Sequence, residues 1–319
     1  MKKDEQTIQI KSQFDTSETF ALAVKGWGLD FQQLDCGPFK ARLHQFGSQN
    51  LLITNVQFNR NILQRGTYPD EMCTFGLTIS QTRPTIKYQE LKSNSLSLFP
   101  HGDHLDAVSH PDFHCYTFMI ANQVVEKRLT ENVPSFVKIM LRQGGLVDSA
   151  SGEVQELRQF LIGLNDEALK DEEFIKSEKF NSEVPDILLD HVISVLSAAN
   201  ERTSSVKQVQ RAKLLQDINS WLAESICKAH SVEETCNRFQ VNERKLRRLF
   251  SEAYGVPPQQ YFLALRLNGV RRDLYQASAS TVKINDIANQ WDFWHMGKFA
   301  KYYHRQFGEL PSVTLKGQV

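Results

Sequence analysis

The side chains best suited to recognising a ligand form a short basic cluster in the last third of the chain. Four basic residues fall within five consecutive positions: Arg244, Lys245, Arg247 and Arg248. An arginine can bind both acceptors of a guanine edge, which gives roughly 1–3 kcal/mol of discrimination between bases. A lysine suits phosphate, which sets affinity and salt dependence rather than sequence. The cluster predicts binding to double-stranded DNA, with base contacts from the arginines and a phosphate contact from Lys245. About one of the four is expected to be merely solvated.

The apolar residues between these basic ones predict the helix that presents them. Leu246, Leu249 and Phe250 recur at i, i+3 and i+4, so they share one face and leave the basic side chains on the others. Asn242 is a suitable N-cap, and Gly255 stands where the helix must end. A short helix, a tight turn and a basic second helix are typical of a helix-turn-helix that enters the major groove.

The same pattern occurs a second time near the end of the chain. The units at 232–253 and 284–306 align with one inserted residue at the second turn, and Gly255 then matches Gly308. Two tandem units fit two successive major-groove segments, roughly 34 Å apart along B-DNA. A single unit could be an ordinary helical hairpin with a solvated basic face. The repetition favours DNA binding.

The second unit carries less base-reading chemistry than the first. Its candidate DNA contacts are His295, Met296, Gly297, Lys298 and Lys301. We expect phosphate contacts from the two lysines. Met296 could contact a thymine methyl, and Gly297 would allow close backbone approach to the groove.

The same stretch, "WDFWHMGKFAKYYHRQFG", is rich in aromatic residues, which alone would suggest a ligand-binding pocket lined by aromatic rings. Alignment with the first unit instead places Phe299, Tyr303 and Phe307 on the apolar seam, so they are predicted to be core. Trp294 has two interpretations, a wedge near the DNA backbone or packing on the bridging helix. We favour packing, because a large apolar ring is usually buried.

A second group of reactive side chains lies in the first half of the chain. Four histidines fall within 14 residues: His101, His104, His110 and His114. Histidines with a carboxylate could hold iron or zinc. However, four histidines this close cannot all point inward from strands, and the spacing does not match ligands from separate strands. We therefore favour a His-rich loop without metal, to which Asp103 and Asp106 add little.

The elements that must position these residues change in type along the chain. Short β-branched and aromatic runs such as "LLITNVQF" and "FHCYTFMI", separated by turn residues, predict a strand-rich domain over 1–148 that forms a small barrel or sandwich. Amphipathic helices are predicted over 149–205, ending in a linker that starts near Ser204. From 206 to 319 the chain is predicted to be all helix, so the fold class is α+β.

Composition sets further bounds on the function. Of 37 basic residues 17 lie between Val206 and Val319, against 10 of 37 acidic residues, so this third carries +7 and the remainder −7. The five cysteines are scattered without a CxxC, which indicates reduced thiols in the cytoplasm. No signal peptide or 18-residue apolar run occurs, so we expect no membrane contact. No GxSxG, P-loop, HExxH or strand-following GxGxxG is present, so we expect neither an enzyme nor a cofactor.

The C-terminal third resembles the AraC/XylS family of bacterial transcription regulators. The resemblance rests on "SVEETCNRFQVNERKLRRLFSEAYGVPPQQYFLALRLNGVRRDL" and "INDIANQWDFWHMGKFAKYYHRQFGELPS". The residues around "FWHMGKFA" are most similar to a subset of the family that includes the ethanolamine-utilisation regulator. Two positions depart from the family pattern. Asp292 replaces the usual glycine of the second turn, where aspartate tolerates positive φ better than most residues, and Thr235 replaces a core leucine.

This resemblance implies two helix-turn-helix units bridged by a long helix over about 259–275. It also implies an N-terminal regulatory domain, often a cupin-like barrel followed by dimerisation helices, and activation through RNA polymerase. Regulators of this kind usually bind small organic effectors without metal. The expected function is therefore a homodimeric, sequence-specific transcription activator. The alternatives are a metal-binding cupin-type sensor or enzyme fused to a DNA-binding domain, and a regulator controlled by a protein partner.

Overall fold

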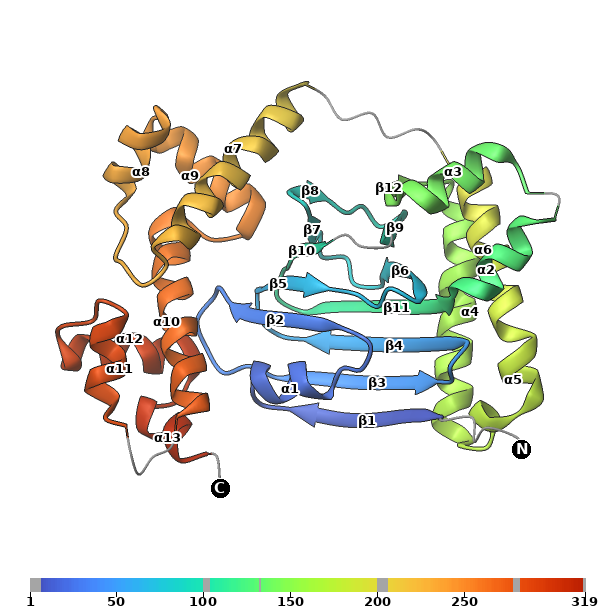
Figure 1. Cartoon of the computed structure of the whole chain (residues 1–319), viewed down its shortest axis with the longest axis horizontal. Coiled ribbons are helices and arrows are strands. Elements are labelled where there is room, and N and C mark those ends of the chain that lie inside the picture. Colours follow the sequence, from blue (N-terminus) through green and yellow to red (C-terminus); the bar gives the residue numbers. More distant parts are fainter. Residues whose placement is uncertain (1–6, 100–103, 132, 200–205, 278–281, 318–319) are drawn as a thin grey trace.

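A computed structural model describes residues 7–99, 104–131, 133–199, 206–277 and 282–317. The chain forms a β-rich domain with a helical layer at one end and a separate helical domain at the other (Figure 1). The linker start predicted near Ser204 lies outside the described residues. No helix in the described part of the chain has the length and apolarity needed to span a membrane.

Two antiparallel sheets make up the β-rich domain. The larger sheet has the strand order β1 (Ile8–Phe14), β3 (Ala41–Gly47), β4 (Leu51–Phe58), β11 (Phe113–Ala121), β6 (Met72–Thr78), β9 (Ser95–Phe99), β12 (Gly145–Asp148). The smaller sheet has the order β2 (Gly28–Gln33), β5 (Ile62–Thr67), β10 (His104–Ser109), β7 (Thr85–Ile86), β8 (Gln89–Glu90). The sheets do not join into a closed barrel, so the fold is the sandwich form of the prediction.

An aromatic core fills one end of the sandwich beside α1 (Ser17–Ala23). Phe20 of α1 is 1% exposed, and its ring lies 5.2 Å from that of Phe31 and 6.1 Å from that of Phe58. Phe31 belongs to the smaller sheet and Phe58 to the larger one. Apolar side chains from both inner faces therefore hold the sheets together.

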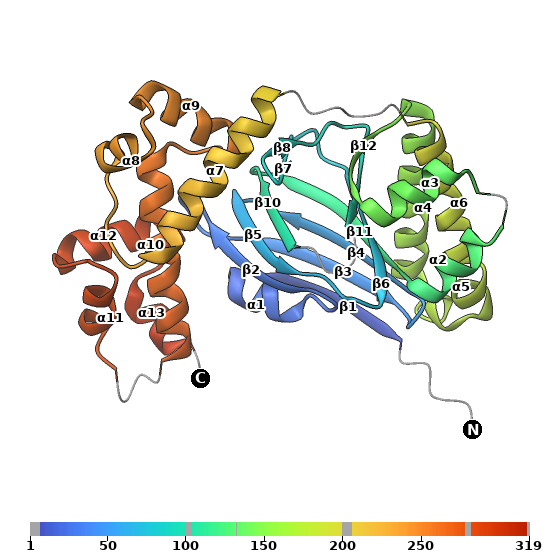
Figure 2. The same ribbon diagram turned by 45° about the horizontal axis from the view of Figure 1, so that its top comes forward.

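A helical layer packs across one end of the larger sheet, opposite the C-terminal domain (Figure 2). It contains α2 (Asn122–Leu129), α3 (Ser135–Gln143), α4 (Ser151–Lys170), η1 (Phe174–Lys176), α5 (Glu178–Ser182) and α6 (Val184–Ser197). Leu157 and Leu161 of α4 and Leu188 and Val192 of α6 are fully buried in a core shared with the sheet. The amphipathic helices predicted over this region are present, and their apolar faces pack within their own chain. Dimerisation through them stays a prediction.

The C-terminal domain is all helix, as predicted. It contains α7 (Val206–Glu224), α8 (Val232–Phe239), α9 (Glu243–Tyr254), α10 (Pro258–Gln276), α11 (Ile284–Gln290), α12 (Met296–Phe307) and α13 (Pro311–Lys316). The helix pairs α8–α9 and α11–α12 are the two helix-turn-helix units, and the long helix α10 bridges them. Each unit has its own apolar core, and α10 contributes to both.

Candidate DNA-binding surface

The first unit is defined by polar caps at each helix start. The Ser231 hydroxyl accepts a hydrogen bond from the Glu234 backbone N–H at 2.9 Å, which begins α8. The Asn242 side chain accepts one from the Lys245 N–H at 2.8 Å, so the predicted cap of α9 is confirmed. Thr235 is fully buried at its leucine-like position because its hydroxyl donates to the Ser231 carbonyl at 2.8 Å. The Ser231 and Asn242 bonds satisfy backbone N–H groups that a helix start leaves free.

Helix α9 buries its apolar face and exposes its basic one, as predicted. Leu246 and Phe250 are fully buried and Leu249 is 4% exposed. The helix ends at Gly255, whose φ of 68° is the left-handed conformation expected of a C-cap glycine. The four candidate DNA-binding residues of α9 are all exposed: Arg244, Lys245, Arg247 and Arg248.

Two of these four side chains lie near acidic neighbours on the same helix, and two do not. Arg247 binds Glu243 one turn earlier, with Nε 2.8 Å from Oε1, and Arg248 lies 3.9 Å from Glu252. Arg244 and Lys245 form no ion pair with any described residue. Exposed i,i+4 pairs stabilise a helix by only about 0.3–0.5 kcal/mol. All four side chains are therefore available to a nucleic acid at little cost.

In the second unit, Trp291 fixes α11 against the bridging helix. Trp291 is 3% exposed and its indole N–H donates to Asp273 of α10 at 2.6 Å. The ring lies directly on Gly269, where a Cβ would be only 2.0 Å from Trp291 Cη2. Only glycine allows this approach, so the second unit depends on close packing at one point of α10.

Asp292 holds the second turn in the left-handed conformation that its sequence position requires. Its φ is 63°, and its carboxylate accepts hydrogen bonds from the Ala229 N–H at 2.9 Å and the Trp294 indole N–H at 2.6 Å. The Ala229 bond, with a smaller contribution from Trp294, lowers the pKa of Asp292. The prediction that aspartate can replace glycine at this turn is confirmed.

Trp294 does not pack on the bridging helix, so the favoured interpretation of this residue is wrong. Its side chain is 68% exposed, because the bond to Asp292 holds the ring at the outer edge of the turn. Phe293 takes the packing position instead, 7% exposed and with the Arg266 guanidinium 4.6 Å from its ring centre. A role for Trp294 at the DNA backbone stays a prediction.

Helix α12 presents its predicted seam to the core. Phe299, Tyr303 and Phe307 are buried, as expected. Four of the five candidate contacts are exposed: His295, Gly297, Lys298 and Lys301. Met296 is half-buried and packs against the core of this unit, so only part of its side chain can reach a ligand.

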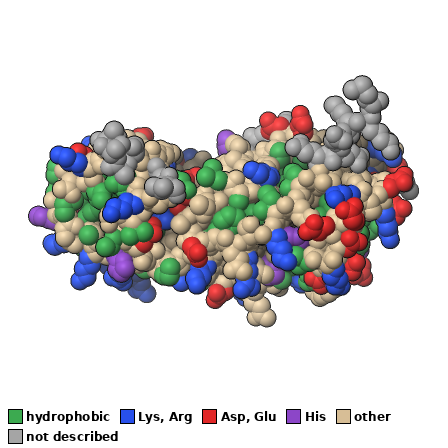
Figure 3. All heavy atoms as spheres, turned by 90° about the horizontal axis from the view of Figure 1, so that it is seen from below, with side chains coloured by type: hydrophobic (Ala, Val, Ile, Leu, Met, Phe, Trp, Pro, Cys, Tyr) green, Lys and Arg blue, Asp and Glu red, His purple; other side chains and the backbone are tan. Residues whose placement is uncertain are grey.

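Charge is distributed unevenly over the surface. In the view from below, Lys and Arg side chains follow the lower edge of the C-terminal domain at the left, and acidic side chains gather over the helical layer at the right (Figure 3). This agrees with the opposite charge balances of the two parts of the sequence. Phosphate groups would be attracted to the C-terminal domain.

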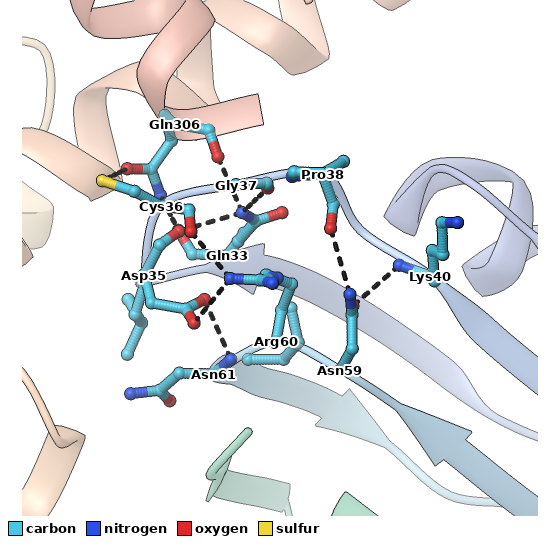
Figure 4. Close-up of polar contacts among 12 residues, drawn as sticks. Gln33, Asp35, Cys36, Gly37, Pro38, Lys40, Asn59, Arg60, Asn61 and Gln306 are labelled. Atoms are coloured by element: carbon cyan, nitrogen blue, oxygen red, sulfur yellow. Dashed lines mark hydrogen bonds and ion pairs between the residues drawn. The ribbon is translucent and has the colours of Figure 1, made fainter. Parts of the chain in front are cut away.

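No sequence motif predicts that the β-rich domain holds the C-terminal end of α12. Gln33 and Gln306 are 1% and 3% exposed, and each side chain donates to the other's backbone carbonyl, at 2.7 and 2.8 Å (Figure 4). Asn268 of α10 pairs with the Gln33 backbone through two further bonds of 2.9 Å. The end of β2 thus joins α10 and α12 through four buried hydrogen bonds.

The C-terminal end of α9 is held in a different way. The Asn61 amide donates to the Tyr254 carbonyl at 2.7 Å, and the Thr85 hydroxyl donates to the Ala253 carbonyl at 3.0 Å. The last carbonyls of a helix have no partner within it, so the β-rich domain satisfies two of them. The C-terminal ends of α9 and α12 therefore both contact the β-rich domain.

Two arginines complete the contact between the domains. Arg271 of α10 is 4% exposed and binds Glu18 at 2.8 Å and Glu309 at 2.7 Å. Arg65 donates to the Tyr261 hydroxyl of α10 at 3.4 Å and pairs with Asp106 of its own domain, which also accepts from the Tyr88 hydroxyl at 3.4 Å. Burial raises the pKa of Tyr88 to about 12, which keeps its hydroxyl a donor.

The histidines of the first half do not form a common site in the described residues. His104 is exposed at the start of β10, His110 packs against Gly255, and the His114 ring lies 2.9 Å from the Asn55 side-chain oxygen. Burial lowers the pKa of both His110 and His114. No three His, Cys, Asp or Glu side chains converge within the described ranges. His101 and Asp103 lie outside them.

Comparison with known sequences identifies similarity in the C-terminal domain. Residues 235–317 match a family model described as a helix-turn-helix domain. The XylDLEGF operon transcriptional activator of Pseudomonas putida is 33% identical over 96 residues, 30% of each chain. The probable thc operon regulatory protein of Rhodococcus erythropolis is 30% identical over 86 residues, 27% of this chain and 26% of the relative. The matches thus span under a third of these relatives' length.

Two solved structures are similar over a longer part of the chain. The AraC-like transcriptional activator CuxR is 14% identical, with a TM-score of 0.45, covering 88% of this chain and all of that one. ToxT from Vibrio cholerae O395 is 12% identical, with a TM-score of 0.30, covering 92% of this chain and all of that one.

Proposed function

Since this chain belongs, through its C-terminal domain, to the AraC/XylS family of transcription regulators, we propose that it is a sequence-specific DNA-binding regulator controlled by its N-terminal domain. Helices α9 and α12 enter two adjacent major-groove segments of a target promoter. The observation that carries the proposal is the pair of helix-turn-helix units on α10, each with its apolar seam buried and its polar face exposed.

The proposed contacts differ between the two helices. In α9, Arg244, Arg247 and Arg248 read base edges and Lys245 binds a phosphate. In α12 and at its start, the residues mainly bind phosphates and let the backbone approach the DNA closely, and they read fewer bases. These residues are His295, Met296, Gly297, Lys298 and Lys301. Sequence preference should therefore be stronger in the half of the site that α9 contacts.

Genome-wide mapping of bound sites followed by footprinting of the purified protein tests this function. We expect two protected major-groove segments one helical turn apart, roughly 34 Å between centres. The half bound by α9 should tolerate fewer base changes. Binding without sequence preference, or protection of a single segment, would contradict the proposal.

We propose that the N-terminal domain senses a small molecule in the cavity between its two sheets. The cavity has a volume of about 90 Å³, and aromatic rings form much of its wall. The aromatic lining residues are Phe20, Trp27, Phe31, Phe58, Phe99 and Phe113. An apolar concave space with few polar groups is the usual form of a ligand site.

Two strands support a route from this cavity to the DNA-binding helices. On β2, Phe31 lines the cavity and Gln33 contacts α10 and α12. On β7, Ile86 lines the cavity and Thr85 binds the end of α9. A ligand that shifts either strand would change how the recognition helices are held.

We further propose that the regulator is a homodimer that activates transcription through RNA polymerase in the cytoplasm. These proposals rest on the family to which the C-terminal domain belongs. Sedimentation equilibrium of the full chain tests the dimer, for which a purely monomeric protein at micromolar concentration would be the contrary result. Transcription from a mapped promoter with purified polymerase tests activation, which requires a higher transcript yield when the regulator is added.

A further inference from the structure

Among the described residues, the wall of the cavity between the sheets has no carboxyl, amino, guanidinium or imidazole group. The described lining residues include no Asp, Glu, Lys, Arg or His. Cys115 is the lining thiol, and burial raises its pKa to about 12, so it stays neutral. A charged ligand would lose its hydration here without gaining an opposite charge, which is strongly unfavourable. The wall therefore selects against carboxylates, phosphates and amines.

Some hydroxyls in the wall already have partners within the protein. Thr54 accepts a hydrogen bond from the Gln45 amide at 2.8 Å, and the Ser109 hydroxyl donates to the Ile62 carbonyl at 3.3 Å. Ser97 differs from both. It is 1% exposed, and its hydroxyl has no hydrogen-bond partner among the described residues. A buried hydroxyl without a partner is destabilising, and a ligand that supplies one would relieve this.

Space for such a ligand group lies next to Ser97. Gly76 of β6 faces Ser97 of β9 directly in the strand pairing. A Cβ built on Gly76 would lie 3.5 Å from Ser97 Cβ and 3.4 Å from a ring carbon of Phe99. All three residues line the cavity, so the missing side chain of Gly76 leaves room beside the Ser97 hydroxyl.

We propose that the effector is a compact, uncharged, mostly apolar molecule, with one hydroxyl or carbonyl group bound by Ser97. This inference rests on the proposed effector role of the cavity. The volume of about 90 Å³ is smaller than an engineered apolar cavity of about 150 Å³ that binds benzene. This space suits a group of about one six-membered ring, and the aromatic wall favours a flat one.

Three probes of similar size test the class of ligand on the full-length protein. Phenol is uncharged and carries one hydroxyl, toluene lacks the hydroxyl, and benzoate adds a negative charge. Dissociation constants are measured by isothermal titration calorimetry at pH 7. We expect phenol to bind about tenfold more tightly than toluene, the usual effect of one hydrogen bond, and benzoate to bind much more weakly than either. Equal binding of benzoate and phenol, or no binding of any probe, would overturn the proposal.

Two variants assign the binding to the cavity. Ser97→Ala should abolish the tenfold preference for phenol and leave toluene affinity unchanged. Gly76→Ala should weaken both, because the added methyl occupies the space beside Ser97. Ser12→Ala, at an exposed serine of β1, is the matched control and should change nothing. Thermal unfolding verifies that each variant is folded. An unchanged phenol preference in folded Ser97→Ala would remove Ser97 from the site.

DNA binding gives an independent readout. Affinity for a mapped site is measured without any probe and then with saturating phenol. Absence of sequence-specific binding both without and with phenol would refute the regulatory function itself. Normal DNA binding combined with the wrong order of probe affinities would refute only the proposed ligand class.

Discussion

The two helix-turn-helix units share an architecture and differ in what stabilises and equips them. Helix α9 has a side-chain cap from Asn242 and four exposed basic residues. Helix α12 starts without a side-chain cap bond and depends on the turn at Asp292 and on the contact of Trp291 with Gly269. Under the proposed function, the first unit supplies most of the charge and base recognition, and the second mainly holds its position on the DNA. Two copies of one fold can therefore contribute unequally to recognition of the base sequence.

The largest effect that separates the units is expected from Gly269→Ala. The new Cβ would lie 2.0 Å from the Trp291 ring, on a buried helix that cannot move away. We expect a loss of about 3 kcal/mol of stability, at the upper part of the range for overpacked sites. Footprinting should show loss of the segment contacted by α12 before that of α9. The matched control is Gly163→Ala in α4, an exposed glycine outside the DNA-binding domain where a Cβ meets nothing within 4 Å. Unchanged thermal unfolding of Gly269→Ala would disprove the role assigned to this contact.

The next effect concerns readout by the first unit. Arg247→Ala should weaken specific DNA binding by about 1–3 kcal/mol while the circular dichroism spectrum stays that of the wild type. Arg83→Ala is a matched control, because Arg83 is an exposed arginine of the β-rich domain paired with Glu90. Gel-shift titrations on target and scrambled sequences measure the change. Wild-type affinity of Arg247→Ala for the target would show that α9 does not read bases through this residue.

A moderate effect is expected at the turn of the second unit. Asp292→Ala removes two hydrogen bonds and places alanine at positive φ, so we expect a loss of about 1–2 kcal/mol. Asp292→Asn keeps the side-chain oxygen and should lose less. The pKa of this carboxyl is lowered in the folded state, so its contribution is complete above about pH 4 and disappears as the pH falls through the folded-state pKa. Unfolding followed against pH should show this acid sensitivity in the wild type and not in Asp292→Asn.

The smallest effect is expected from Lys298→Ala. A lysine bound to phosphate contributes to affinity without sequence preference. The slope of log K against log salt should decrease by about 1, equally for target and scrambled DNA. A larger loss on the target sequence than on scrambled DNA would mean that α12 reads bases, which would make the two units more alike than proposed.

Features set by neighbours in sequence could be predicted. The caps at Asn242 and Gly255, the seams of α9 and α12 and the left-handed turn at Asp292 depend on residues within one or two helical turns. Trp294 was assigned to packing because a large ring is usually buried. That prediction failed because the carboxylate of Asp292 binds the indole and leaves Phe293 to fill the core.

Features set by distant residues could not be predicted. Gln33 and Gln306 are common polar residues in no motif, and only the folded chain brings them together over 273 positions. The cavity likewise depends on how two sheets pack face to face. The sequence predicts that Asp106 adds little to a His-rich loop, yet it pairs with Arg65, whose side chain donates to the Tyr261 hydroxyl of α10.

Strand β2 carries Phe31 in the cavity wall and Gln33 in the contact with α12, and this has a thermodynamic consequence. If a ligand in the cavity changes the affinity for DNA by some factor, DNA must change the affinity for that ligand by the same factor. A promoter fragment is then itself an effector of the cavity. Promoters of different sequence, by holding α12 differently, would give the same protein different sensitivities to one signal.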